Sequence, residues 1–365
     1  MLLLELPNEI LARVLSFHDT PSPFDTSVLQ KPRSPWDSDT AHPLDPSPPT
    51  PNPLKQLSLT SRFTRSLVLP ILFKHVILEP AFLSEFLVFL KSYDLAFRVG
   101  SVVAHVAGHY NHLHPVWWAR LLNEVPATRL GIVAPPDVFA GLVGVSSFSN
   151  DAWTFDMPFQ ILRLEQSAEA VQSKIDYDNL PNFLVARPWT GMVVNEGSSL
   201  MAYTRYEFFL RRPPSLLAAL HFNRSVAGDA LFASLLSFDF IAIFPFYNHV
   251  DEILKCVRKM KRLTRLFVKL CPEPDSTVLH DEIEVTGGHL DVNDPWNECE
   301  TSWTLVAHTV VFLTMEGALQ ELRMDDVKVE GVRETLENSL AAKLQDYWTY
   351  QAPRSGVWKR KTLGM

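Results

Sequence analysis

Short β-type runs and apolar helical stretches alternate along most of this chain, and the interval between them recurs. The predicted strand centres are about 23–30 residues apart, with two gaps of about twice that length. These centres lie near Val103, Ile132, Leu162, Leu220, Ile243, Phe267 and Leu322. One helix and one strand of this size cannot bury their own apolar faces, so neighbouring units are expected to stack against one another.

Three of the β-type runs alternate apolar residues with polar or small ones, at Thr128–Ile132, Thr264–Val268 and Gln320–Met324. Such alternation places one side of a strand in a core and the other side on an open sheet surface. The unit length lies in the range of leucine-rich repeats, although no unit carries the asparagine that follows the strand in that repeat. We therefore expect an irregular, leucine-rich-repeat-like α/β solenoid over residues 79–350. The alternative is a single closed α/β domain with mixed strand order.

The regular pattern lapses twice, between Ser167 and Pro214 and between Glu273 and Glu300. Prolines, glycines and polar residues in the first segment and acidic residues in the second predict long loops, with Met192–Val194 as a candidate for a further strand. Insertions of this kind often carry binding residues in repeat proteins. After Gly331 the apolar residues return at four-residue spacing and predict a closing helix, marked by Val332, Leu336, Leu340 and Leu344.

Two apolar segments near the N-terminus, Leu2–Phe17 and Leu54–Leu78, depart from this pattern because they indicate mainly helices. Pro7 suits the first turn of a helix, where its missing N–H is not needed, and Glu9 then lies at the positive end of the helix dipole. An apolar face follows, formed by Ile10, Leu11, Val14 and Leu15. A module of this size cannot bury all of its apolar residues, so the rest of the chain or a partner must cover the surplus.

Together the two segments resemble an F-box, the helical module by which substrate receptors dock on the Skp-type adaptor of a cullin–RING ubiquitin ligase. The residues that carry the resemblance are Leu6-Pro7-x-Glu9-Ile10, Val14-Leu15, Leu57-x-Leu59-Thr60-Ser61-Arg62-Phe63 and Pro70-x-Leu72-Phe73, with Val76 and Leu78. The overall layout is similar to that of F-box proteins of filamentous fungi. The alternative interpretation of these residues is an ordinary amphipathic pair of helices.

The resemblance implies that the partners are a Skp-type adaptor, through it a cullin, and an unidentified client protein. Carried over position by position, the adaptor-binding residues are expected to be Leu6, Pro7, Ile10, Leu11, Val14, Leu15, Leu57, Leu59 and Leu72. The implied fold class is a small all-α F-box followed by the α/β solenoid. Such a receptor acts by bringing a client lysine close to the ligase, so we expect no catalytic residues and no cofactor.

Between the two helical segments, residues 19–53 are rich in proline, serine, threonine and aspartate. This composition cannot bury enough apolar surface to offset the entropy of ordering, so a disordered insertion is expected. The chain then divides into an F-box-like module at 1–78 that contains the insertion, a substrate-recognition domain at 79–350 and a flexible basic tail at 351–365.

Charge and composition narrow the classes of partner. The formal net charge is −8 at pH 7, so a global basic field for nucleic acid is absent. The three cysteines are odd in number and lack the spacing of a zinc site, which fits a reducing cytoplasm or nucleus. No basic region accompanies the N-terminal leucines, and the apolar run Leu231–Phe246 contains Asp239 and is short for a bilayer. Neither a signal peptide nor a membrane span is expected.

Two groups of residues contain side chains of the kinds that bind metal ions. His105, His109, His112 and His114 recur at short spacing, but no cysteine or acidic residue accompanies them, so surface or capping roles are favoured. The acidic group Asp281, Glu282, Glu284, Asp291 and Asp294 lacks the spacing of a calcium loop. The sequence contains no nucleotide-binding or nucleophile motif. The alternatives to a receptor are an enzyme with its active site in the 167–214 or 273–300 loops, and a non-degradative scaffold bound to the adaptor.

Overall fold

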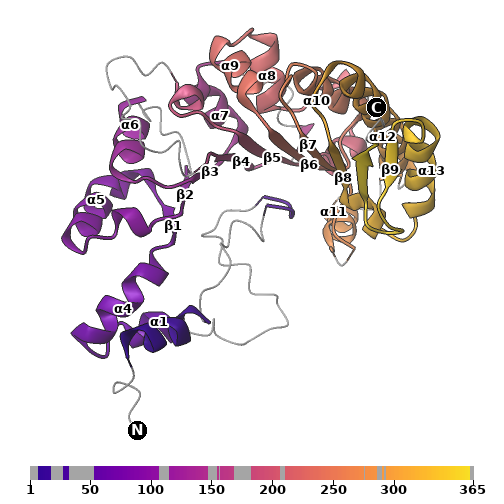
Figure 1. The fold of residues 1–365 in the computed structure, drawn as a ribbon. Helices are drawn as coiled ribbons and strands as arrows, with labels where there is room; N and C mark the ends of the chain where they lie inside the picture. The colour runs from indigo at the N-terminus through magenta and orange to yellow at the C-terminus, as the bar shows by residue number, and fades with distance from the viewer. Residues whose placement is uncertain are drawn as a thin grey trace.

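The computed structural model describes residues 7–17, 28–32, 53–106, 115–146, 154–155, 157–167, 182–205, 210–274, 276–285, 290–291 and 293–361. These residues form a mixed α/β structure around a ten-stranded, mostly parallel sheet, with a small group of helices beside it (Figure 1). None of the helices in these ranges combines the length and the apolar character that crossing a membrane requires.

The strands pair in the order in which they occur in the chain, except that β10 lies between β8 and β9. β1, β2 and β3 run parallel, and so do β5 to β8, whereas β4 runs antiparallel to both of its neighbours. β10 runs antiparallel to β8 and to β9. The strands are β1 His75–Leu78, β2 Ser101–His105, β3 Arg129–Ala134, β4 Gln160–Glu165, β5 Gly191–Ser198, β6 Ser237–Ile243, β7 Arg265–Lys269, β8 Glu321–Met324, β9 Trp348–Tyr350 and β10 Val357–Arg360.

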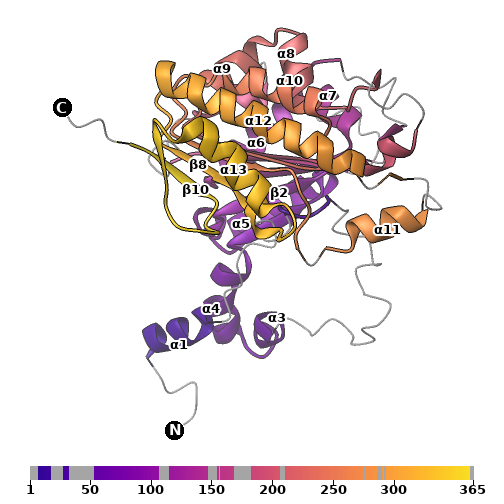
Figure 2. The same cartoon turned by 90° about the vertical axis from the view of Figure 1, so that its right-hand side faces the viewer.

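Most of the connecting helices lie along the outer, convex side of the curved sheet (Figure 1). They are α5 Leu83–Ser92, α6 Pro115–Glu124, α7 Pro136–Val143, α8 Leu216–Phe222, α9 Val226–Ser234, α10 Tyr247–Val257, α12 Asn293–Glu316 and α13 Arg333–Leu344. Right-handed crossovers between successive parallel strands place every helix on the same side when the strand order is sequential. α11, Val278–Val285, stands apart from this layer (Figure 2).

Alternate residues of the strands belong to two separate apolar clusters. Val102, Leu130 and Ile132 belong to the main core, which the helices share. Their neighbours Val103 and Val133 belong to a second cluster, on the concave side of the sheet. Both faces are therefore buried, which is usual for parallel strands and explains why these strands are apolar over nearly their whole length.

The N-terminal module consists of α1, Asn8–Ser16, α3, Pro53–Leu57, and α4, Arg62–Leu72. A capping box begins α4: the Ser61 hydroxyl accepts the N–H of Thr64, and the Thr64 hydroxyl accepts the N–H of Ser61. Leu15, Leu54 and Val68 form the small core of the module. α4 leads almost directly into β1, so the module lies next to the first strand of the sheet (Figure 1).

Six of the seven predicted strand centres lie in strands, namely in β2, β3, β4, β6, β7 and β8. The prediction at Leu220 is wrong, because this residue lies in α8. The Ser215 hydroxyl accepts the N–H of Ala218 and so caps this helix, whose apolar residues are buried on several sides. The strand in this part of the chain is β5, and it contains Met192–Val194, the further strand that the sequence indicated.

Three segments expected to be loops or disordered contain regular structure or packed residues. The 273–300 segment contains α11 and the start of α12. The tail contains β10, whose Trp358 is buried and stacks on Tyr350 with ring centroids 4.6 Å apart. In the insertion, Pro53 begins α3 and residues 28–32 pack against the sheet; the other residues of 19–53 lie outside the described ranges. Two of these differences depend on contacts that are distant in sequence, because β10 pairs with β8 and Val28 packs on the sheet.

Candidate functional site

Exposed apolar side chains gather on the N-terminal module. Ile10 and Val14 of α1 are 46% and 39% exposed, and Phe17, which directly follows that helix, is 80% exposed. Their spacing of four and three residues places them along one side of the helix. Leu59 and Phe63, which are 78% and 41% exposed, flank the start of α4. We call these five residues the module surface; exposed apolar residues at this density on a small module mark a surface that associates with a partner.

The structure divides the residues that the sequence assigned to adaptor binding. Pro7, Ile10, Val14 and Leu59 are exposed. Four others lie wholly or partly inside the module: Leu11 and Leu15 are buried, and Leu57 and Leu72 are half-buried. Leu6 lies outside the described residues. The buried leucines hold the helices together, whereas the exposed residues remain available to a partner.

Phe17 and Phe63 are absent from the adaptor-binding residues that the F-box resemblance implies. Phe17 follows Ile10 and Val14 at helical spacing, so the period that identified α1 was also a signal for it. Phe63 belongs to the motif that carries the F-box resemblance, but nothing local indicated that its ring would be exposed.

The concave side of the sheet carries an apolar patch that extends across six strands. Its members, one from each of β2 to β7, are Val103, Val133, Ile161, Val193, Ile241 and Phe267. We call these residues the concave patch. Val28 completes the cluster and Leu29 packs against it, so a segment between α1 and α3 in the chain covers the patch (Figure 1).

The side chain of Asn195 in β5 binds the main chain of this segment. The Asn195 Nδ2 donates to the carbonyl oxygens of Val28 and Gln30, both at 2.7 Å. Its Oδ1 accepts the N–H of Gly197 at 2.9 Å. The pairing of β5 with β6 shifts register between Asn195 and Ser198, and Gly197 adopts a φ of +86°. This bulge, which glycine permits, orients the amide so that both of its N–H groups face the segment.

Ion pairs flank the concave patch. Arg163 lies 3.0 Å from Glu165, and Arg265 lies 3.5 Å from Asp239. The guanidinium of Arg323 stands 5.5 Å from the ring centroid of Phe267. Burial raises the pKa of Asp239, although Arg265 and Arg163 oppose the shift. The face therefore has an apolar centre with charged side chains around it, which is the usual composition of a protein-binding surface.

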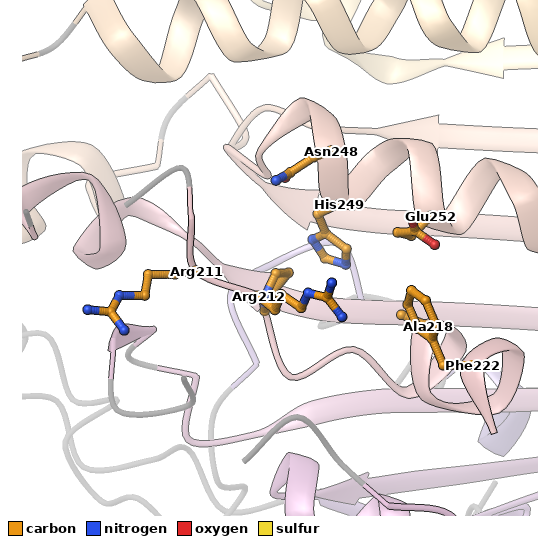
Figure 3. Close-up of a pocket in the computed structure, with 8 residues that line it drawn as sticks. Arg211, Arg212, Ala218, Phe222, Asn248, His249 and Glu252 are labelled. Carbon is orange, nitrogen blue, oxygen red and sulfur yellow. The ribbon is translucent and has the colours of Figure 1, made fainter. Parts of the chain in front are cut away.

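A cavity of about 240 Å³ lies between α8 and α10 (Figure 3). Its lining consists of Arg211, Arg212, Pro213, Ala218, Phe222, Asn248, His249 and Glu252. Figure 3 shows Arg212 extending toward Phe222, and its guanidinium lies 5.5 Å from that ring centroid. The buried Nδ1 of His249 has no hydrogen-bond partner within the described ranges. Arg212 places a guanidinium that suits a small anion at the cavity, whereas Arg211 points away from the other lining residues and Glu252 adds a carboxylate to the lining (Figure 3).

His249, which lines this cavity, also belongs to a buried hydrogen-bond network with Glu196 and Ser215. The Nε2 of His249 lies 2.7 Å from Oε2 of Glu196, and the Ser215 hydroxyl donates to Oε1 of the same carboxylate at 2.7 Å. Hydrolases use these residue types, but in them the imidazole stands between the hydroxyl and the carboxylate. Here the carboxylate stands in the middle, so His249 is not placed to take the proton of Ser215. This hydrogen-bond network fixes the positions of His249 and α8 and does not activate a nucleophile.

Comparisons with protein-family models, with curated proteins and with solved structures found no match to this chain. A function must therefore be inferred from the structure itself. Three features bear on it: the module surface, the concave patch with the segment that covers it, and the cavity beside His249.

Neither the histidine group nor the acidic group assembles into a metal site in the part of the chain that the structure describes. His105 is buried in β2, while His109, His112 and His114 fall outside the described ranges. Across those ranges, no three His, Cys, Asp or Glu side chains are grouped so that they could hold a metal ion. Cys256, Cys271 and Cys299 are buried free thiols. Burial raises the pKa of Cys256 to about 12, which keeps it protonated and unreactive at neutral pH.

Proposed function

We propose that this protein is the substrate-receptor subunit of a cullin–RING ubiquitin ligase. The observation that carries the proposal is the exposed apolar module surface, on a small helical module that precedes a much larger α/β unit. The resemblance of the module to an F-box assigns this surface to a Skp-type adaptor. The α/β unit would then bind the client protein, with the concave side of its sheet, which carries the apolar patch, as the proposed binding face.

The strand order supports a repeat-like interpretation of the α/β unit. Each strand from β2 to β7 pairs with the strand before it and the strand after it in the chain, and most helices share one side of the sheet (Figure 1). Stacked helix–strand units of about 23–30 residues would produce this arrangement. β4 and the β10–β9 pair depart from it because they introduce antiparallel neighbours. We infer an irregular, leucine-rich-repeat-like solenoid.

The mechanism of such a receptor is proximity. One surface holds the ligase and another holds the client, so a client lysine reaches a high effective concentration at the ligase without any bond being made by this chain. A non-degradative scaffold would bind the same adaptor. The lifetime of the client separates the two, because only a receptor shortens it.

Charged substitutions on the module surface test the docking step. In the Ile10→Asp/Leu59→Asp variant we expect affinity for the Skp-type adaptor to fall by about 100-fold, because each change places a carboxylate in an apolar contact. Binding is measured by isothermal titration calorimetry after co-expression and pull-down. The buried Leu11 is avoided as a target because its replacement would unfold the module.

The matched control is Phe97→Asp/Val226→Asp, which changes two apolar residues that are 83% and 84% exposed on the α/β unit. This variant should bind the adaptor as tightly as the unchanged protein. Equal losses in both variants would show a general effect of charge and not docking. A folded, unchanged protein that does not bind the adaptor would overturn the receptor proposal.

A second candidate function, binding of a small anion, is favoured by the cavity that Arg211 and Arg212 line beside His249. If the cavity is a binding site, inorganic phosphate or citrate at about 100 times its Kd stabilises the protein by about 2.7 kcal/mol. Differential scanning fluorimetry would show this as a rise in Tm of a few degrees. The Arg212→Glu variant is expected to lose the rise, because it reverses the charge at the cavity.

Arg262→Glu is the control, since Arg262 is exposed and is not part of the cavity lining. A rise in Tm of the same size in all three proteins would indicate a general salt effect and exclude the cavity as the site. This result would not bear on adaptor binding, which uses a different part of the chain.

A further inference from the structure

The segment that covers the concave patch has the features of a bound peptide. Val28 is buried in the cluster formed by the patch, and Leu29 packs beside it. Its main-chain carbonyl groups at Val28 and Gln30 accept both N–H groups of the Asn195 amide. A side-chain amide that binds carbonyl groups recognises the main chain of a peptide, and an apolar patch recognises its apolar side chains. Together they make a site for a short peptide.

Asn195 and the concave patch are held in place by contacts within the sheet and not by this segment. Asn195 is positioned by the bulge in β5 and by its own bond to Gly197. The patch residues come from six strands whose ladder holds them in place. The segment itself comes from between α1 and α3, which is a part of the chain outside the sheet. The site therefore belongs to the sheet, and the segment is its occupant.

We propose that the concave patch with Asn195 is the client-recognition site and that residues 28–32 occupy it as an internal pseudoligand. The client is then a protein that presents a short segment with two adjacent branched aliphatic side chains, and with accessible main-chain carbonyls on the first of them and on the residue that follows the second. The proposal rests on the receptor function proposed above. It identifies the class of client by chemistry, and it makes release of residues 28–32 a condition for client binding.

Competition in trans tests the site directly. A fluorescein-labelled peptide of residues 26–34 is titrated with the full-length protein and with its Val28→Asp/Leu29→Asp variant, and anisotropy is measured. A tethered segment competes at an effective concentration in the millimolar range. We therefore expect the peptide to bind the variant at least about tenfold more tightly than it binds the unchanged protein.

Two controls test whether the site recognises the two apolar side chains of the segment. The Gln30→Ala variant keeps the apolar pair and the main chain and changes only an exposed side chain, so it should bind the peptide as weakly as the unchanged protein does. The same peptide carrying Val28→Asp and Leu29→Asp should not bind the double variant. Peptide binding of equal strength to all three proteins would place the contact elsewhere and overturn the proposal.

A second variant guards against misfolding. Replacing residues 28–32 by glycine and serine introduces no buried charge, and the same gain in peptide affinity is expected from it. If both variants fold by circular dichroism and neither binds the peptide more tightly, the concave patch is not a recognition site. If neither folds, residues 28–32 are part of the core and the proposal also fails, because a pseudoligand is dispensable for folding.

Failure of this inference and failure of the receptor function have different signatures. The anisotropy assay needs no adaptor, and the pull-down with the module-surface variant needs no peptide. Peptide binding without adaptor binding would leave a peptide-recognition protein that is not a ligase subunit. Adaptor binding without peptide binding would leave the receptor function in place and require another client site.

Discussion

Replacement of Asp326 by leucine is expected to lower the free energy of unfolding by about 4 kcal/mol. The buried Asp326 carboxylate accepts the main-chain N–H groups of Leu270 and Cys271, both at 2.9 Å, and the indole N–H of Trp303 at 3.0 Å. Leucine would leave these three donors in the interior without this acceptor, and each unsatisfied donor costs about 1–3 kcal/mol. Urea unfolding followed by circular dichroism measures the change.

Asp346→Leu is the matched control for this substitution. Asp346 is exposed, so its replacement should alter the free energy of unfolding by no more than about 0.5 kcal/mol. If Asp326→Leu lowered the free energy of unfolding as little as the control does, the three donors would have to find other acceptors. The end of β7 and α12 would then not depend on this carboxylate.

Replacement of Gly356 by alanine should cost about 3 kcal/mol or more, and the damage should centre on one edge of the sheet. Gly356 has a φ of +65°, which is strained for any residue with a Cβ. A Cβ here would also overlap the carbonyl oxygen of Met324 and approach Cγ2 of Val327 at 2.9 Å. The main-chain bond from Met324 N to Gly356 O holds this turn against β8, so the clash should detach β10.

Hydrogen exchange provides the readout for this prediction. Amides of β9 and β10 should lose protection in Gly356→Ala, while those of β2 and β3 keep theirs. Gly331→Ala is the control, because a Cβ at Gly331 meets no atom within 4 Å. Unchanged protection at β9 would mean that the turn shifts to accept a side chain, contrary to the prediction.

The sequence predicted most of the sheet because apolar period and turn residues act locally. β2, β3 and β7 alternate residues for the two faces, and their neighbours in the sheet are also their neighbours in the chain. β5 was harder to identify because its second half contains Asn195 and Glu196, which are fully buried. Polar residues inside a strand contradict the expected pattern unless their partners are known, and Ser215, His249 and residues 28–30 are distant in sequence.

The division of the N-terminal leucines illustrates a second limit. Ile10 and Val14 lie beside Leu11 and Leu15 on a helix with apolar residues on more than one side, and the period alone does not say which pair faces inward. The position of α4 decides it. The segment 28–32 illustrates a third limit, since its composition predicts disorder and its contact with Asn195 spans 167 positions in the chain.

The sequential order of the strands has a consequence for biosynthesis. As the chain leaves the ribosome, every strand from β2 to β8 finds a partner that has already been made, so the sheet can grow by one strand at a time with contacts that are close in sequence. β9 is the exception, because it pairs with β10, which follows it. β9 therefore has to wait for synthesis of β10, which then joins the new hairpin to β8 in a single step.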